Sequence, residues 1–600
     1  MLKTCAMESD MKKWIPLCYC MSSLFCNASH AQEVPAGEMD SKGSDIELLR
    51  PGHPRDEIPL PAIDPQQVEP PQLNLPRESI PVSDRWRLME ALGYKFPLYD
   101  SYNQNALKGD LPVLKEWGDQ LFFNLGVISD SLEEARRLPT PVASQISIQP
   151  GANDVFGHNQ QNAFIQNLIV SMDISKGDTT FRPPDYEFRF VPVFNYNRVG
   201  VEEAGVLNIN PSYGTHRAEE FVGIQELFAD VHLRNVSERY DFDSLRVGVQ
   251  PFTNDFRGFL FVDSPFGIRL FGNRFNNQVQ YNLAWFRRFE KDTDSGLNDV
   301  SQAMRKDDTF VANAYHQDWP ITGMTTQVSL VHNTNHDNSF YYDKNGFLAR
   351  PALVGDVRPH EYQVTYPGVN MDGHVGVWNL SASAYGAFGT DSHNPIAQQS
   401  QQIEAGFFAT ELSRDVDWMR VRGNFLVASG DKNPNSNKAT GFDAIAENPQ
   451  FAGSDTSFFI RQALPLIGGG GVELSGRNGL LPSLRSSLSE GQSNFVNPGI
   501  SLIGVGADFD VLPELRLFTN LSFLNFMNTS SLSLLRNQPI TSTSIGTDLS
   551  VGLHWRPFLN QNVIINGSVA ALIPGSGLKE LYGSNQGTYY SALFNVVFTF

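Results

Sequence analysis

The sequence has little cysteine, and all of it lies near the start of the chain. The 600-residue chain contains four cysteines: Cys5, Cys18, Cys20 and Cys26. Residues 11–31 combine a basic start, a short apolar stretch and small residues at Ser29 and Ala31, which is typical of a secretory signal peptide. We therefore expect residues 1–31 to be a signal peptide, with either Met1 or Met11 as the first residue. The mature chain then has no cysteine, which excludes disulfides, thiolate metal sites and cysteine nucleophiles.

A lipid anchor on Cys26 is the alternative for this leader. Leu24 and Phe25 precede this cysteine, whereas a lipoprotein site requires small residues there. The pattern therefore favours a cleaved signal peptide.

Long hydrophobic runs are also absent. After Ala31 no stretch approaches the roughly 18 consecutive apolar residues of a membrane helix. If the chain spans a membrane, it must do so as a closed barrel, because only helices and closed barrels satisfy their own backbone hydrogen bonds in lipid. The mean hydropathy of −0.26 suits such a barrel, in which only alternate residues meet lipid.

Positive charge is scarce relative to negative charge. The proposed mature chain has 42 basic and 63 acidic residues, a net charge of −21. This balance argues against nucleic acid as a partner.

Catalytic signatures are missing too. The chain has no H-E-x-x-H sequence, no Walker loop and no nucleophile elbow. Gly468 to Gly471 form a run of glycines, but no Lys-Ser/Thr pair follows to bind phosphate, so the run reads as a flexible loop. We therefore predict that the protein is not an enzyme.

Proline is concentrated ahead of the main domain. Residues 32–82 have no periodic apolar pattern, and nine prolines lie between Pro51 and Pro81. This composition is typical of an extended, disordered segment, which is either a periplasmic arm for a partner or a plain spacer. Residues 83–118 read as a lead-in segment with a short helix.

The last twelve residues, Tyr589 to Phe600, show a strict alternation. One parity is apolar throughout: Tyr590, Ala592, Phe594, Val596, Phe598 and Phe600. The other parity is mixed, so one face suits lipid and the other suits a watery interior. Such a strand closes a barrel, and its terminal Phe600 resembles the signal by which the barrel assembly machinery recognises outer-membrane proteins. The alternative is the edge strand of a soluble β-sandwich, but an exposed edge strand with apolar side chains would promote aggregation.

Residues 119–600 divide into segments with this strand-like pattern. Their predicted cores are 120–130, 162–173, 185–197, 221–234, 244–252, 266–272, 277–287, 308–317, 324–332, 360–367, 375–388, 402–412, 417–429, 499–511, 514–527, 544–555, 562–573 and 588–600. Long and short connections alternate between them, which is the outer-membrane arrangement of external loops and periplasmic turns. We predict an all-β, antiparallel, up-and-down transmembrane barrel of about 18 strands in the bacterial outer membrane, with both termini in the periplasm and lipid around it.

Parity then separates the residues that face the lumen from those that face lipid. In the strand at 417–429, Met419, Val421 and Phe425 alternate with Arg420 and Arg422. Because charge on the lipid face is costly, the charged parity must face the lumen. The predicted lumen residues are Arg189, Arg246, Arg269, Arg288, Arg420, Arg422 and Arg516, with Glu187, Glu226, Asp230, Glu361, Glu404, Asp508, Asp510 and Asp548.

Two features of the stretch between residues 430 and 498 remain open. Asp431, Asn433, Asn435 and Asn437 alternate as in a calcium loop, but Ser436 replaces the usual glycine and no glutamate follows at the twelfth position. The segment is either a calcium site or a polar turn. A later apolar stretch either folds into the lumen as a plug or packs on the external rim; it contains Phe458, Phe459, Ile460, Leu464, Leu466 and Ile467.

Two motifs resemble the alginate-export family of outer-membrane barrels. They are V-A-S-G-D-K-N-P-N-S-N-K-A-T-G-F-D (427–443) and G-A-D-F-D-V-L-P-E-L-R-L (506–517), and the resemblance is strongest over residues 417–600. It implies an eighteen-stranded passive conduit. The family's polyanion exporters concentrate arginine and lysine in the pore, whereas this lumen is mixed, so the resemblance does not imply a substrate.

These observations lead to one function and two alternatives. We predict a passive outer-membrane channel, porin-like or an export conduit, for a polar or charged solute or polymer. The first alternative is a structural or surface-binding barrel with a blocked lumen, and the second, with the least support, is an outer-membrane enzyme. No cofactor is expected apart from the calcium considered above.

Overall fold

The computed structural model describes residues 92–93, 105–113, 121–140, 160–177, 183–237, 241–462, 464–466, 479–583 and 587–600. All of these belong to one compact unit, Pro61–Phe600. The predicted signal peptide (1–31), the proline-rich segment (32–82) and most of the lead-in (83–118) lie outside the described residues.

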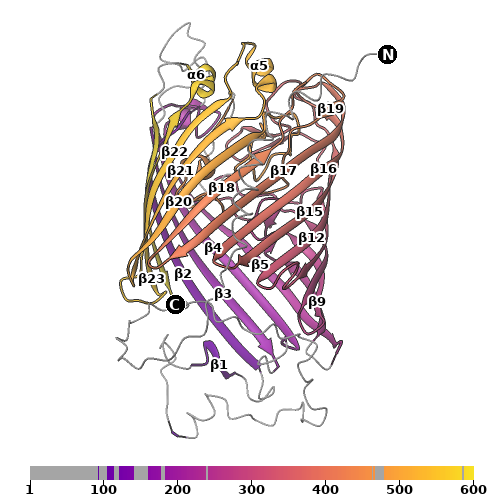
Figure 1. Ribbon diagram of the computed structural model, residues 1–600, viewed down its shortest axis with the longest axis vertical. Coiled ribbons are helices and arrows are strands. Elements are labelled where there is room, and N and C mark those ends of the chain that lie inside the picture. Colours follow the sequence, from indigo (N-terminus) through magenta and orange to yellow (C-terminus); the bar gives the residue numbers. More distant parts are fainter. Residues whose placement is uncertain are drawn as a thin grey trace, which may run out of the picture. The chain divides into compact units, whose positions relative to one another are not determined.

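Eighteen antiparallel strands form a closed barrel, as predicted (Figure 1). Each pairs with its neighbour along the chain, and the last pairs with the first, from Ile128↔Thr599 to Arg137↔Tyr590. The strands are β2 (Leu121–Arg137), β3 (Gln160–Lys176), β4 (Tyr186–Val201), β5 (His216–Asn235), β6 (Phe242–Val249), β9 (Phe266–Arg274), β10 (Val279–Arg287), β11 (Asp307–His316), β12 (Met324–Asn335), β15 (Tyr362–Val375), β16 (Trp378–Asn394), β17 (Gln399–Val416), β18 (Met419–Ala428), β20 (Ile500–Leu512), β21 (Leu515–Phe526), β22 (Ser544–Trp555), β23 (Val563–Pro574) and β24 (Tyr589–Thr599).

Short elements complete the described chain. β1 (Lys108–Pro112) pairs with β2, and β19 (Lys438–Ala439) pairs in parallel with β17. Two small hairpins lie in connections: β7 (Phe252–Thr253) with β8 (Val262–Asp263), and β13 (Tyr341–Tyr342) with β14 (Leu348–Arg350). The helices are η3 (Pro211–Tyr213), α4 (Phe458–Arg461), α5 (Ser530–Arg536) and α6 (Ser576–Tyr582). Within the described part of the chain, no helix has the length and apolar character to cross a membrane.

Connections differ at the two ends of the barrel. α5 and α6 lie in connections at one end, and the C-terminus lies at the other (Figure 1). At the second end, tight turns use left-handed residues such as Asn276 (φ 57°) and Asp417 (φ 53°). Outer-membrane barrels place long loops outside the cell and short turns in the periplasm. We therefore call the first end external and the second periplasmic.

The outer face of the barrel is apolar. Alternate strand residues expose large apolar side chains, among them Phe188, Leu283, Val328, Ile503, Val569 and Phe594. Soluble proteins rarely expose so extensive an apolar surface, whereas a barrel in lipid requires it. The predicted parity of β24 is confirmed, since Tyr590, Phe594 and Phe598 are exposed while Tyr589, Ser591 and Asn595 are buried. This is the architecture of a bacterial outer-membrane barrel.

The boundary between β15 and β16 differs from the prediction. The sequence placed the connection at 368–374, but β15 continues to Val375 and the turn falls at Gly376 (φ 59°). Gly368 is needed inside the strand because a Cβ atom there would lie 2.2 Å from the Tyr385 ring. The glycine therefore serves close packing of the Tyr385 ring in the wall, and not a turn.

Candidate functional site in the barrel lumen

The connection between β18 and β20 folds into the lumen. Phe458 and Ile460 of α4 are fully buried, and Ser457 caps the helix by accepting a hydrogen bond from the backbone N–H of Ile460. Asp548, on the lumen face of β22, accepts hydrogen bonds from the Ser457 hydroxyl and the Phe459 N–H, both at 2.7 Å. For Phe458, Phe459 and Ile460 the structure therefore shows the alternative in which the stretch folds into the lumen. Leu464 and Leu466 line a cavity together with external connections, and Ile467 lies outside the described residues. We call residues 441–462 the lumen loop.

A second connection, 250–265 between β6 and β9, meets the lumen loop. The N–H of Asn448 donates to the Gly258 carbonyl and the N–H of Val262 donates to the Ala446 carbonyl, both at 2.8 Å. The buried Asp255 carboxylate holds this connection in shape by accepting the backbone N–H groups of Phe259 and Leu260 at 3.1 Å. The two connections together narrow the lumen.

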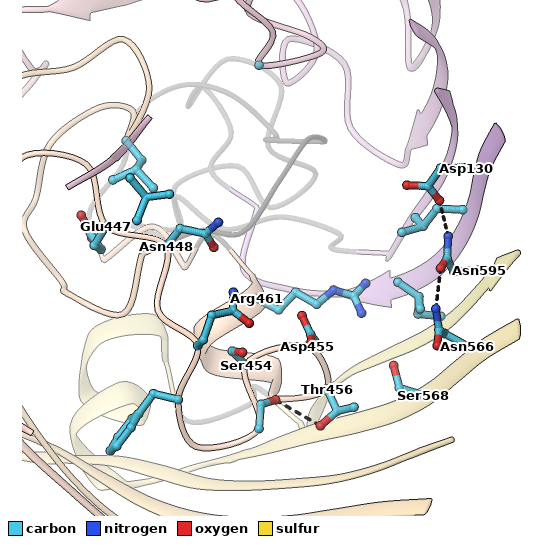
Figure 2. A pocket seen from close by; sticks show the side chains of 18 of the residues that line it. Asp130, Glu447, Asn448, Ser454, Asp455, Thr456, Arg461, Asn566, Ser568 and Asn595 are labelled. Carbon is cyan, nitrogen blue, oxygen red and sulfur yellow. Dashed lines mark hydrogen bonds between the residues drawn. The ribbon is translucent and has the colours of Figure 1, made fainter. Parts of the chain in front are cut away.

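Two cavities lie beside the lumen loop in the described part of the chain. The larger has a volume of about 1080 Å³ and is bounded by the loop and by the inner faces of strands from both halves of the barrel (Figure 2). The smaller, about 440 Å³, is lined by the loop and by external connections, with apolar residues such as Leu207, Phe347 and Leu481 beside charged ones such as Arg217 and Asp294. Four residues line both cavities: Arg136, Glu447, Leu488 and Ser489. We call the place where the two cavities meet, marked by these four shared residues, the constriction of the lumen.

The constriction is braced by ionic and amide contacts to β2. Glu134 accepts from Arg461 at 2.8 Å and from the Gln462 amide at 2.7 Å. Arg136 donates to Gln161 at 3.0 Å and to Gln462 at 2.9 Å. These contacts join the lumen loop to the wall across more than 320 positions of sequence.

Among the described residues, every lysine and arginine side chain that lines the larger cavity forms an ion pair. The pairs are Arg136–Glu134 (3.6 Å), Arg461–Glu134 (2.8 Å), Arg257–Glu411 (3.2 Å), Arg288–Asp263 (3.1 Å), Lys291–Asp263 (2.5 Å) and Arg422–Asp508 (2.7 Å). Asp130, Glu447 and Asp455 add further carboxylates to the lining. The described lining of the cavity is therefore polar and mixed in charge, and its carboxylates outnumber its lysine and arginine side chains.

The structure places most of the predicted lumen residues on the inner face, in pairs. Arg246 lies 2.8 Å from Asp230, Arg189 lies 2.9 Å from Glu226, and Arg516 lies 2.6 Å from Asp510. Arg269 donates to the Asn282 amide oxygen at 2.7 Å. Arg420 pairs at 2.5 Å with Asp415 at the periplasmic end of β17. Of the predicted set, Arg288, Arg422 and Asp508 line the larger cavity.

Two predicted lumen residues are corrected. Glu404 has the outward parity of Phe408 on β17, and it pairs with Lys438 at 2.9 Å. Glu361 precedes β15 and pairs with His336 at 3.0 Å near the external end. The parity rule failed at β17 because aromatic residues occupy both of its faces, with Phe407 inward and Phe408 outward.

The predicted calcium segment forms a backbone turn around Asp431. One oxygen of this buried carboxylate accepts the Asn433 N–H at 2.8 Å, and the other accepts the Thr440 N–H at 2.9 Å. Across the described residues, no group of three or more histidine, cysteine, aspartate or glutamate side chains is placed to hold a metal ion. Calcium binding by Asp431, Asn433, Asn435 and Asn437 stays a prediction.

A buried carboxyl inside the lumen loop predicts a pH dependence. Burial raises the pKa of Asp443 to about 7 from its ordinary 3.8, partly offset by the Arg485 guanidinium and reinforced by Glu447. Protonation therefore stabilises the packed loop. This stabilisation is fully present below the ordinary pKa and is lost as the pH rises through about 7. We expect stronger hydrogen-exchange protection of 441–462 at pH 5 than at pH 8.

The matched variant is Asp443→Asn, which keeps the shape and removes the titration. It should reduce the difference in protection factors between the two pH values. An unchanged pH difference in this variant would assign the effect to another group.

Comparison with known proteins gives structural similarity only. No protein-family model matches the chain, and no curated protein matches it; the resemblance to alginate exporters therefore has no family match behind it. Among solved structures, the chain is similar to Pseudomonas aeruginosa OccK9 (OpdG), with 11% identity over 80% of this chain and 98% of that chain and a TM-score of 0.43. It is similar to a BenF-like porin from Pseudomonas fluorescens Pf-5 (10%, 80% and 99%, TM-score 0.44) and to Acinetobacter baumannii OccAB2 (10%, 80% and 98%, TM-score 0.44). At this level of similarity nothing about substrate or mechanism carries over to this chain.

Proposed function

We propose that the protein is a passive outer-membrane channel for small polar solutes. The observation that carries this proposal is the polar cavity of about 1080 Å³ inside a closed, lipid-facing barrel, narrowed by a folded loop. Eighteen-stranded barrels leave an aqueous interior. A lining of paired charges and amides lets solvated molecules pass without binding them too tightly to leave.

Small solutes fit this lumen better than a charged polymer. A conduit for a polyanion would need cations free to follow the polymer. Here each lysine and arginine side chain in the described lining of the larger cavity already has a carboxylate partner. The lumen loop also crosses the path that an extended polymer would take. Both features support a solute that is short and not strongly anionic.

Arg422 and Asp508 offer a direct test of charge selectivity. Both are partly buried in the cavity wall at 2.7 Å, and Arg422 also donates to Asn520 at 2.9 Å. Because the pair is neutral as a whole, Arg422→Ala should leave a carboxylate alone and shift reversal potentials in a salt gradient toward cations. Asp508→Asn should shift them toward anions.

The double variant restores neutrality, so it should return the permeability ratio close to that of the wild type. Arg420→Ala is the control, since Arg420 pairs with Asp415 at the exposed periplasmic rim and does not line the cavity. A strong loss of anion permeability in Arg420→Ala would contradict this account.

The proposal itself is tested by conductance. The refolded mature chain should form single channels in planar bilayers and admit small uncharged solutes into liposomes. Deleting residues 443–462 should raise the conductance severalfold, because most of the lumen loop that narrows the pore is then removed. Wild-type protein that is correctly folded by heat-modifiability and circular dichroism, yet does not conduct, would contradict the channel function.

The second candidate is a structural or surface-binding barrel with an occluded lumen. Its support is the buried apolar cluster that joins the two inward connections, including Leu260, Phe261, Phe442 and Phe458. For this function, wild-type protein should be silent in bilayers while the 443–462 deletion conducts. The two proteins measured side by side therefore separate the candidates.

A further inference from the structure

A row of polar side chains crosses six neighbouring strands on one wall of the larger cavity. The strands pair in the order β22, β23, β24, β2, β3 and β4. Each contributes one member of a row of cavity-lining residues that we call the polar row: His554, Asn566, Asn595, Asp130, Asn167 and Asn195. Most of them sit directly opposite one another, as in the pairs His554↔Asn566, Asn566↔Asn595 and Asn167↔Asn195.

Hydrogen bonds run along the row. The Asn566 amide donates to the Asn595 carbonyl oxygen at 2.8 Å, and the Asn595 amide donates to the Asp130 carboxylate. The His554 ring nitrogen Nδ1 lies 2.8 Å from the Asn566 oxygen, and the Asn195 amide donates to the Asn167 oxygen at 2.7 Å. Figure 2 shows Asp130, Asn595 and Asn566 linked in this way beside the segment that carries Ser454, Asp455 and Thr456.

Carboxamides in such a row keep unused hydrogen-bond donors and acceptors for a ligand. A carboxamide has two N–H donors and an oxygen with two lone pairs. Among the described residues, Asn566 uses one N–H donor toward Asn595 and one acceptor site toward His554, so one N–H and one lone pair remain. Asn595 donates both N–H groups, to Asp130 and to the Ser131 carbonyl, and keeps one lone pair of its oxygen as an acceptor site. A hydroxyl group donates and accepts at once, which matches a neighbouring donor and acceptor on the same amide.

Charge disfavours an anion at the same place. Asp130 is the carboxylate of the row and repels a bound carboxylate, whereas a hydroxyl donates to it. Arginines of the same cavity are already paired, as Arg461 is with Glu134 at 2.8 Å and Arg422 with Asp508 at 2.7 Å. An anion would therefore lose hydration in the cavity without gaining an unpaired cation.

We propose that the polar row is a binding subsite for uncharged, hydroxyl-rich solutes of monosaccharide or sugar-alcohol size. The inference rests on the proposed channel function and deepens it by naming the class of solute. A solute in the 1080 Å³ cavity exchanges its hydrogen bonds with water for bonds to successive amides around the wall. The row thus offers several weak, equivalent positions, which suits passage better than one tight site.

The competing explanation is that the row only braces the barrel wall, as cross-strand hydrogen bonds do in any sheet. The chain contains a matched control for this. Asn282 and Asn313 lie directly opposite each other on β10 and β11, and the Asn282 amide donates to the Asn313 oxygen at 2.8 Å. Both are buried on the inner face, but neither lines the larger cavity.

The experiment uses the full mature chain with glucose and gluconate as probes. In liposome swelling, glucose should enter faster than gluconate, and in planar bilayers glucose should block the ion current reversibly. Asn566→Leu with Asn595→Leu should weaken the glucose block about tenfold, since two hydrogen bonds to the solute are lost. Asn282→Leu with Asn313→Leu should leave the block unchanged. If the first double variant does not assemble, Asn566→Ala alone is expected to weaken the block about threefold.

Three results would overturn the inference. Gluconate could enter as fast as glucose, the two double variants could weaken the block equally, or an assembled Asn566 variant could keep the wild-type block. A conducting wild type without a glucose preference contradicts only this inference. A folded wild type that does not conduct contradicts the proposed channel function and, with it, the subsite.

Discussion

Asp548→Ala is expected to detach the lumen loop from the barrel wall and to turn a steady channel into a noisy one of higher conductance. The carboxylate accepts the Ser457 hydroxyl, the Phe459 N–H and, at 3.3 Å, the Phe458 N–H. Hydrogen bonds to a charged group contribute about 1.5–3 kcal/mol each. Losing the set and leaving buried donors unpaired should cost at least about 3 kcal/mol, which shifts the balance between attached and detached loop by more than about a hundredfold.

Two controls give this result its meaning. Asp548→Asn retains the shape and one acceptor oxygen, so its effect should be intermediate. Asp510→Ala removes another inward carboxylate, which pairs with Arg516 near the periplasmic rim and does not touch the loop, so its conductance should match the wild type. Hydrogen exchange of residues 453–462 checks the loop independently of any current. Wild-type protection and wild-type current in Asp548→Ala would contradict the anchoring role.

The barrel was predictable from sequence because its constraint is local and repeats along the chain. A strand in lipid must alternate, and 589–600 does so without exception on its outer parity. The weakest strand prediction, 266–272, is confirmed as β9 (Phe266–Arg274), where Ile268 faces out and Arg269 faces in. Alternation alone was enough to predict this strand, because whether each side chain faces lipid or the lumen is visible in its own polarity and does not depend on distant partners.

The constriction was not predictable because its partners are far apart in sequence. The prediction ended the first strand at residue 130, before E-E-A-R-R, which reads as a charged loop. β2 in fact continues to Arg137, and Glu134 and Arg136 turn inward to meet Arg461 and Gln462. Glu134 and Arg136 lie two positions apart, so on a strand both side chains point to the same face. This spacing was the signal in the sequence that could have placed both of them in the lumen. Only the folded loop shows why two charges are tolerated there.

The lumen loop illustrates the same limit. Phe458 and Ile460 predicted burial, but equally in the lumen or on the rim. The choice depends on Asp548, some 90 positions away, which supplies acceptors for the start of α4 inside the barrel. Amphipathic patterns thus predict that a segment is buried, whereas the location depends on which polar groups meet its helix end.

The closing strand carries the second large prediction. Phe600 continues the outward parity of β24, and its backbone N–H and carbonyl pair with Val127 at 2.8 Å and 3.2 Å. The Lys108 ammonium lies 3.9 Å from the centre of its ring. Deleting Phe600, or replacing it by aspartate, is expected to reduce the heat-modifiable barrel in outer membranes to a small fraction of the wild-type amount.

The free-energy cost of the new charge shows whether lost stability or failed assembly would cause that loss. A charge on the lipid face costs about 0–1 kcal/mol near the membrane interface, where the strand ends. Such a cost is too small to unfold a barrel closed by ten β2–β24 residue pairs. We therefore expect Phe600→Asp to refold in detergent as the wild type does and to fail only in cells, if assembly machinery recognises β24 as we predict. Thr599→Asp, the same charge one residue earlier on the lumen-facing parity, should assemble in both settings. Wild-type amounts of barrel in cells that lack Phe600 would show that the terminal aromatic is dispensable, and equal failure in detergent would assign its role to stability.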